Sequence, residues 1–213
     1  MKKISVLIAD DHEVVRQGIR KSLEDTTDIS VDGETGDGYE ALDMAIRGSF
    51  GAMILDIAMP GPGAMEIIKE LTQRKPDLPI LVLSMHPAKQ YAVRTIRAGA
   101  AGYLTKECLT SEIVTAVRTI ASGQRFVTNA VAEQLANAVA NGCPDRSALA
   151  QLSDREYQIL CMIGAGKMLK EIAAELALSP KTVSTYRARI LEKTSLQTTA
   201  DLVRYAVTEG LVS

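Results

Sequence analysis

The stretch Ile4-Ser5-Val6-Leu7-Ile8-Ala9-Asp10-Asp11 is a short apolar run that ends on two carboxylates. Continuous apolar runs of this length, partly β-branched, are typical of strands buried on both faces of a parallel sheet. The runs Ala52–Leu55 and Ile80–Leu83 share this pattern, and weaker strands are expected at Ile29–Glu34 and Gly102–Leu104. These runs together predict a parallel sheet whose first strand begins at Ile4.

Helix-like segments occupy the intervals between these strands. The expected helices are Glu13–Glu24, Tyr39–Arg47, Ala64–Gln73, Ala88–Arg97 and Ser111–Ser122. Five successive strand–helix units predict an α/β fold, a flavodoxin-like, doubly wound (βα)5 domain over residues 1–125.

The remainder of the chain has a different character. Residues 126–151 are expected to hold the helix Asn129–Ala140 and then a linker at Asn141–Ser147, where Gly, Pro and Asp break regular structure. Residues 152–213 are predicted to form an all-α, four-helix domain. Its expected helices are Asp154–Ala165, Leu169–Ala177, Pro180–Lys193 and Thr199–Glu209.

Capping signals locate two of these helices. Ser153 with Glu156 forms a capping-box pattern, and Ser179-Pro180 places a cap before a proline at the first turn. Only Leu178-Ser179 separates the second and third helices, which is the helix-turn-helix pattern.

Charge and composition narrow the function classes. The 213 residues carry a formal charge of −2, but the segment from Gly166 to Lys193 holds six basic and three acidic residues, a local excess of three positive charges. Such local asymmetry is typical of a DNA-binding surface. The three cysteines are odd in number and lack a Cys-x-x-Cys spacing, so we expect reduced, structural thiols. Because no apolar run is long enough to span a bilayer and the first residues do not form a signal peptide, we expect a cytoplasmic protein with no membrane partner.

Acidic side chains gather where two strands end. Asp10 and Asp11 follow the first strand, and Asp56 follows the third. In the predicted strand order these strands are neighbours, so their carboxyl ends bring the three carboxylates together. The carboxylates would repel each other unless a cation is bound, and hard oxygen ligands suit Mg²⁺.

Two more polar residues follow strands at the same edge. Ser84 follows the fourth strand, and Lys106 follows the fifth. A hydroxyl and an ammonium placed there can hold phosphoryl oxygens, while an Asp carboxylate can act as a nucleophile and become an aspartyl phosphate. The set predicts that Asp56 is phosphorylated, with Mg²⁺ and Lys106 neutralising charge.

These motifs resemble a known family. Asp10-Asp11, Asp56 with Met59-Pro60-Gly61, Ser84, and Tyr103 before Lys106 resemble the receiver domain of two-component systems. Leu152–Glu156, Glu171–Ala173 and Ser179–Val183 resemble the LuxR-type helix-turn-helix. Together they are similar to the NarL/FixJ family of response regulators over nearly the whole chain.

The resemblance implies specific roles. Asp56 would be the phosphate acceptor for a sensor histidine kinase, and Asp10, Asp11, Asp56 and the backbone carbonyl of Ala58 would share the Mg²⁺. Ser84 and Tyr103 would be the pair whose rearrangement signals phosphorylation. We expect Ser84 to be pulled toward the phosphoryl oxygens and Tyr103 to turn inward. The phosphorylated protein would be a homodimer on paired DNA half-sites, with the helix near Thr199–Glu209 at the dimer contact.

The sequence departs from the family pattern at three places. Gly61–Met65 lacks the usual Met-Asp-Gly, which indicates an altered loop beside Asp56. Gly166–Lys170 lacks the usual Ser/Thr-Asn, which puts the cap of the second C-terminal helix in question. Thr194 replaces a common Leu, so we expect looser packing at the end of the third helix.

The third C-terminal helix is expected to read DNA. Its residues Val183, Tyr186 and Ile190 recur at helical spacing and should face the domain core. We expect the opposite face to contact base edges, through Ser184, Thr185, Arg187 and Ala188. Phosphate contacts are expected from Lys170, Lys181, Thr182, Arg189 and Lys193.

Other functions are weighed against this interpretation. A phosphohydrolase with an Asp nucleophile generally needs a second acid two residues later, where this chain has Ala58, so we expect no enzyme. The basic, hydroxyl-rich third C-terminal helix argues against a module that only docks on proteins. The intact acidic pocket argues against a regulator controlled by a small ligand. His12, which can be imagined as a catalytic base, is interpreted as a residue at the start of a helix.

Overall fold

The chain forms two compact units, residues 1–141 and 142–213. The computed structural model describes residues 3–84, 88–106, 110–140, 148–176 and 178–212. The predicted linker Asn141–Ser147 and the cysteines Cys108 and Cys143 lie outside these residues. Among the described residues, no helix is long and apolar enough to cross a membrane.

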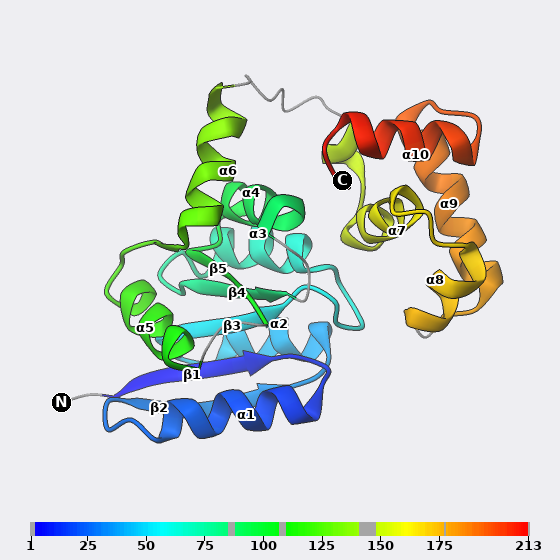
Figure 1. The fold of residues 1–213 in the computed structure, drawn as a ribbon. Helices are drawn as coiled ribbons and strands as arrows, with labels where there is room; N and C mark the ends of the chain where they lie inside the picture. Colours follow the sequence, from blue (N-terminus) through cyan, green and yellow to red (C-terminus); the bar gives the residue numbers. More distant parts are fainter. Residues whose placement is uncertain (1–2, 85–87, 107–109, 141–147, 177, 213) are drawn as a thin grey trace. The chain divides into compact units, whose positions relative to one another are not determined.

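The first unit is built on a parallel sheet with strand order β2-β1-β3-β4-β5-β6 (Figure 1). The strands are β1 Ile4–Ala9, β2 Ile29–Thr35, β3 Ala52–Asp56, β4 Ile80–Ser84, β5 Gly102–Thr105 and β6 Phe126–Val127. The central strands β3 and β4 are buried along their whole length, as their unbroken apolar runs predict. The doubly wound order is confirmed, and it places the ends of β1 and β3 side by side.

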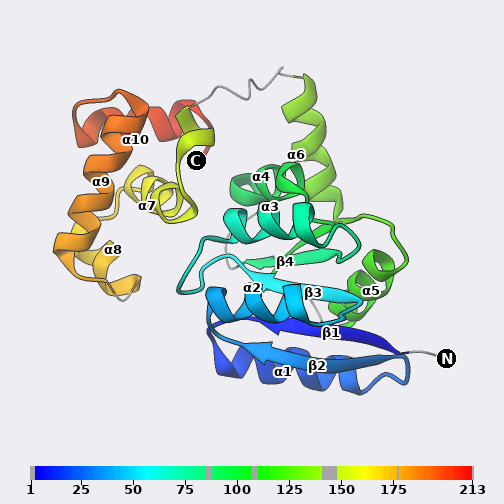
Figure 2. The ribbon, with the colours of Figure 1, turned by 180° about the vertical axis from the view of Figure 1, so that it is seen from behind.

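Helices cover both faces of this sheet (Figures 1 and 2). Helices α1 and α5 pack together on one face, while α2, α3 and α4 pack in series on the other. The core between the sheet and the α1–α5 layer includes Ile8, Leu23, Ile54, Leu83 and Val117. The helices are α1 Glu13–Glu24, α2 Gly38–Arg47, α3 Ala64–Arg74, α4 Ala88–Ala98 and α5 Thr110–Ala121.

The first unit extends beyond the five expected strand–helix units. The two-residue strand β6 pairs with β5, and helix α6, Asn129–Ala140, packs on α4. Val131 of α6 is almost fully buried. The sequence predicts α6 with the observed bounds but assigns it to a connecting segment, whereas its packing makes it part of the first unit.

The second unit is helical, as predicted. A short 3-10 helix, η1 Ala148–Gln151, precedes α7 Asp154–Gly164, α8 Leu169–Glu175, α9 Pro180–Thr194 and α10 Thr199–Thr208. The expected capping box of α7 is present, because the Ser153 hydroxyl accepts the Glu156 N–H and Glu156 accepts the Ser153 N–H. Ser179 caps α9 by accepting the Thr182 N–H.

The start of α8, where the sequence departs from the family pattern, is capped by a residue of the helix itself. Its N-cap is Met168, which supplies no side-chain cap. Instead, Glu171 accepts the Met168 N–H at 2.7 Å from the third position of the helix. At the end of α9, the Thr194 hydroxyl donates to the Ile190 carbonyl, which satisfies the polar group that replaces a common Leu.

Candidate functional site

The acidic cluster predicted from the sequence forms at the carboxyl edge of the sheet. Ala9 of β1 pairs with Leu55 of β3, so Asp10 and Asp56 follow at neighbouring strand ends. Asp10 is 1% exposed and Asp56 2% exposed. Buried carboxylates are costly without a partner, so the surroundings of these two side chains define the site.

Lys106 connects the two buried carboxylates. Its Nζ lies 2.6 Å from Asp10 Oδ2 and 2.8 Å from Asp56 Oδ2. The Lys106 N–H also donates to the Ser84 carbonyl, which fixes the lysine beside the end of β4. Burial lowers the pKa of Lys106, but the charges and hydrogen bonds of Asp56 and Asp10 outweigh it, so the pKa is raised and the ammonium is retained.

Asp56 combines a basic carboxylate with a fixed position. Its burial raises the pKa, and the charge of Lys106 opposes this rise only in part. The carboxylate also accepts a backbone hydrogen bond from Ala58. A carboxylate that is held in place and less well solvated than in water is suited to act as a nucleophile.

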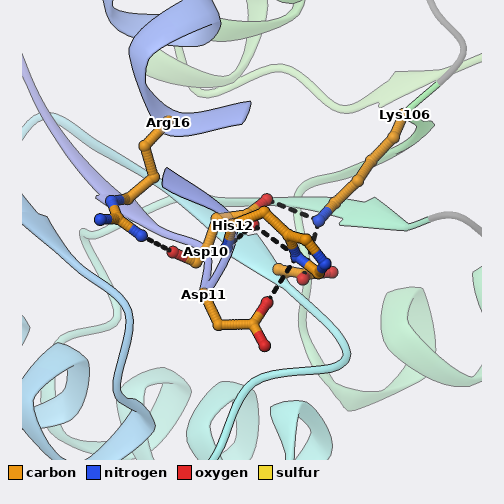
Figure 3. A network of polar contacts seen from close by, with 6 residues as sticks. Asp10, Asp11, His12, Arg16 and Lys106 are labelled. Atoms are coloured by element: carbon orange, nitrogen blue, oxygen red, sulfur yellow. Dashed lines mark hydrogen bonds and ion pairs between the residues drawn. The ribbon is translucent and has the colours of Figure 1, made fainter. Parts of the chain in front are cut away.

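Two residues at the start of α1 extend the site (Figure 3). His12 Nδ1 lies 2.7 Å from Asp11 Oδ1, while its backbone N–H donates to Asp10 Oδ1. From the side opposite Lys106, Arg16 donates to the backbone carbonyl of Asp10 at 2.6 Å. His12 is the N-cap of α1, in keeping with a residue at a helix start, but its ring makes no capping hydrogen bond.

Ser84 and Tyr103 form a second buried group next to the carboxylates. Ser84 is 1% exposed and Tyr103 fully buried, and their side chains are hydrogen bonded to each other. Burial raises the pKa of Tyr103 to about 12, so the phenol is neutral at physiological pH. The expected inward turn of Tyr103 on phosphorylation differs from this structure, in which the ring is already buried.

The acidic cluster has the donors that a hard cation requires. One ligand atom each from Asp10, Asp11, His12 and Asp56 lie within 4.8 Å of one another. Asp10 Oδ2 is buried, and the Lys106 ammonium lies 2.6 Å from it. A buried carboxylate that shares one cation with Asp56, beside the further oxygen ligand of Asp11, fits a divalent metal ion.

In the second unit, α9 has the predicted division of faces. Val183 and Ile190 are fully buried, and Tyr186 is half-buried beneath the Arg189 guanidinium, 5.9 Å from the ring centre. The expected base-contacting residues lie toward solvent, with Ser184, Thr185 and Ala188 exposed and Arg187 half-buried.

The residues expected to contact phosphates fall into two groups. Lys170, Lys181 and Arg189 are exposed, and Thr182 is half-buried near the N-terminus of α9. Lys193 differs, because its Nζ lies 2.6 Å from Glu156 Oε2, a carboxylate that is 3% exposed.

Arg16 and Glu156 are partners of the candidate sites that the sequence pattern does not reveal. Arg16 lies about one turn into α1, and no strand end or motif points to it. Glu156 is recognised in the sequence only as part of a capping box, because its contact with Lys193 joins residues 37 positions apart.

Each of the two units matches a known protein family. A family model described as "Response regulator receiver domain" matches residues 6–118, and one described as "Bacterial regulatory proteins, luxR family" matches residues 150–206. The response regulator UvrY of Escherichia coli K12 is 38% identical over 208 residues, covering 98% of this chain and 95% of that protein. The response regulator GacA of Pseudomonas aeruginosa is 37% identical over 209 residues, which is 98% of each chain.

Solved structures of response regulators are similar to this chain over nearly its whole length. The RcsB response regulator of Salmonella typhimurium, in a study of its conformational dynamism for DNA interaction, has a TM-score of 0.61 and 27% identity over 98% of this chain and 100% of that chain. RcsB of Salmonella enterica bound to promoter rprA with the phosphomimetic BeF₃⁻ has a TM-score of 0.61 and 26% identity, covering 96% of this chain and 98% of that chain. A structure of two RcsB dimers bound to two parallel DNAs has a TM-score of 0.59 and 26% identity, covering 97% of this chain and 99% of that chain. The chain therefore belongs to the NarL/FixJ family of two-component response regulators, transcription regulators that join a receiver domain to a LuxR-type DNA-binding domain.

Proposed function

We propose that Asp56 is the phosphoacceptor of this response regulator and that a sensor histidine kinase is the donor. The observation that carries the proposal is a buried carboxylate held 2.8 Å from Lys106 Nζ within the acidic cluster. A carboxylate oxygen of Asp56 forms the new bond to phosphorus, while the bond from phosphorus to the donor's histidine nitrogen breaks. The product is an acyl phosphate on Asp56.

Charge has to be neutralised during this transfer. Asp10, Asp11, Asp56 and the backbone carbonyl of Ala58 would hold Mg²⁺, which when bound supplies positive charge to the phosphoryl oxygens. Lys106 supplies a second positive charge from the end of β5, at the same edge of the sheet. Arg16 holds the Asp10 backbone in place and so keeps the metal-binding carboxylate at the pocket.

The response to phosphorylation would begin at Ser84. The added group carries roughly −1.5 to −2 charges and strong acceptor oxygens, so it competes with Tyr103 for the Ser84 hydroxyl. Loss of the Ser84–Tyr103 hydrogen bond would then alter the packing of β5 and α4, a change that acts on a two-state surface.

The output is binding to double-stranded DNA as a homodimer. RcsB, which is similar over nearly the whole chain, is described in complexes with promoter DNA and as dimers on DNA, and this supports the same output here. Ser184, Thr185, Arg187 and Ala188 of α9 would face base edges, while Lys170, Lys181, Thr182 and Arg189 would hold phosphates.

Hydrogen bonds within α9 narrow what its hydroxyls would recognise. Ser184 donates to the Pro180 carbonyl and Thr185 to the Lys181 carbonyl. Because each hydroxyl hydrogen is already used, these oxygens are left as acceptors. They would therefore favour the amino groups of adenine or cytosine in the major groove.

We also propose that the protein works in the cytoplasm and catalyses no reaction beyond its own phosphorylation. The UvrY and GacA relatives are named as response regulators, and the position two residues after Asp56 is Ala58, which offers no acid.

Mass spectrometry of the intact protein tests the phosphoacceptor. Incubation with acetyl phosphate and Mg²⁺ should add one phosphoryl group to the wild type and none to Asp56→Asn. Excess EDTA should abolish labelling. A phosphorylated Asp56→Asn protein would refute the assignment, and full labelling in EDTA would refute the role of the metal.

A further inference from the structure

The recognition helix α9 is joined to the start of α7 by a buried carboxylate. Glu156 Oε2 accepts the Ser153 N–H at 2.7 Å and lies 2.6 Å from Lys193 Nζ. The residue as a whole is 2% exposed. One carboxylate oxygen thus completes the cap of α7 and meets the last turn of α9.

The environment of Glu156 keeps this contact charged. Burial raises the pKa of Glu156, but the Lys193 ammonium and the hydrogen bonds from Ser153 outweigh it and lower the pKa. An ionised buried carboxylate that lost its cation would remain uncompensated, which is strongly unfavourable. Lys193 is therefore held by the protein itself.

The position of Lys193 on α9 also directs it away from the reading face. Lys193 lies nine positions after Ser184, which at 3.6 residues per turn places the two on opposite sides of the helix, about 14 Å apart along its axis. Lys193 lies one turn beyond the buried Ile190. It therefore shares the side of α9 that packs on the domain.

We propose that Glu156 and Lys193 are positioning residues of the DNA-binding site, and that Lys193 acts through Glu156 rather than on a DNA phosphate. The pair would fix the end of α9 against α7 and so set the direction in which Ser184 and Thr185 present their oxygens. This inference rests on the proposed DNA contact of α9, and it replaces the phosphate role that the sequence suggests for Lys193.

The two roles predict different salt dependence. A side chain that neutralises a phosphate releases a counterion, so its removal lowers the slope of log affinity against log salt by about one. A positioning residue changes the affinity without changing that slope. Glu156 gives a second test, in which the two roles predict opposite changes in affinity. Removal of its negative charge should strengthen binding to DNA by general attraction, but should weaken binding if the carboxylate is needed to orient α9.

The experiment uses the full-length protein and a short duplex selected from a random library with the wild type. Affinity is measured across a salt series for Lys193→Met, Lys193→Arg, Glu156→Gln and the double variant Glu156→Gln/Lys193→Met. We expect Lys193→Met and Glu156→Gln each to weaken binding about tenfold, a size typical of coupling between residues in contact, with the wild-type slope. The double variant should bind no worse than either single one, and Lys193→Arg should retain most of the affinity.

Lys181→Ala is the control, because Lys181 is exposed and should lower the slope by about one. If Lys181→Ala leaves both slope and affinity unchanged, the proposed DNA face is wrong. If Lys181→Ala behaves as expected but Lys193→Met lowers the slope to the same extent, Lys193 contacts DNA and the positioning role is refuted. Should Glu156→Gln not fold, the slopes of Lys193→Met and Lys193→Arg decide alone.

Discussion

At the scale of the residue, the receiver site is a balance between three carboxylates and one ammonium. Lys106 is 5% exposed and is shared by Asp10 and Asp56, so it supplies the positive charge that holds two buried acids in place. A divalent ion bound by the same oxygens would take over part of that task. Lys106 and a bound metal ion would therefore be partly interchangeable for stability.

This exchange predicts how Lys106→Met responds to metal. In EDTA the variant should lose about 3–5 kcal/mol of unfolding free energy, the usual cost of breaking a buried ion pair. Added Mg²⁺ should stabilise the variant more than the wild type, because the ion then neutralises otherwise unpaired carboxylates. Urea unfolding in EDTA and in Mg²⁺ measures both effects.

Lys69→Met is the matched control, since Lys69 is an exposed lysine of α3. It should change stability little, and Mg²⁺ should stabilise it as much as the wild type. Equal stabilisation of Lys106→Met and wild type by Mg²⁺ would contradict the shared role of lysine and metal.

Much of this site could be predicted at the residue level because parallel strands end at one edge of the sheet. Asp56 and Ser84 end their strands and Asp10 and Lys106 directly follow theirs, so locating the strands was enough to bring them together. Arg16 and the Lys193–Glu156 pair could not be found in this way. Their partners are set by how helices pack, and the sequence pattern does not encode that packing at any fixed spacing.

At the scale of the element, close approach between helices depends on glycine at one position. Gly99 follows α4 with φ of 120°, and a Cβ there would overlap Thr72 Oγ1 of α3. Thr72 Oγ1 is held by its hydrogen bond to the Ile68 carbonyl, so it has little freedom to move aside.

Gly99→Ala should therefore destabilise the protein more than Gly123→Ala. Gly123 also has positive φ, at 82°, but its Cβ would meet nothing within 4 Å. Backbone strain should cost each variant about 1–2 kcal/mol. Overpacking against Thr72 should add about 1–3 kcal/mol for Gly99→Ala alone.

Thermal and urea unfolding measure the difference, and Thr72→Ala in the Gly99→Ala background should recover most of the added loss. Equal destabilisation of the two alanine variants would show that α3 and α4 adjust without cost.

The elements also show why some boundaries are predictable and others are not. Capping residues gave the starts of α7 and α9 correctly, because the cap is a local hydrogen bond. Strand β6 is only two residues long and carries no alternating pattern, so only its pairing with β5 identifies it. The assignment of α6 to the first unit rests likewise on its contact with α4.

At the scale of the whole molecule, the proposed dimer on DNA needs an apolar contact that the monomer leaves open. Val207 of α10 is 55% exposed, although its neighbour Ala206 is fully buried. The family resemblance implies a dimer contact on this helix, and we propose that Val207 forms part of it. An exposed valine there is suited to pack against a second copy of the chain.

Val207→Asp should weaken binding to DNA with paired half-sites by about tenfold or more. This is the loss of affinity typical when an energetically important interface residue is changed. Binding to a single half-site should change little. Gel-shift titrations on both duplexes measure the two affinities.

Thr208→Asp provides the control, because it adds the same charge at the next exposed position of α10. A loss that is the same for both variants would point to general repulsion from DNA instead of a lost dimer contact.

The packing of α6 on α4 has a consequence for how such regulators exchange their parts. Recombination between two relatives preserves an input module only if the crossover leaves its folded unit whole. A splice after residue 125 would take α4 and α6 from different parents, although they pack together and Val131 of α6 is buried. It would also take β6 from a different parent than β5, the strand with which it pairs. A splice after residue 140 keeps these contacts in one parent, so hybrid regulators with a new output should arise by joining at that later point.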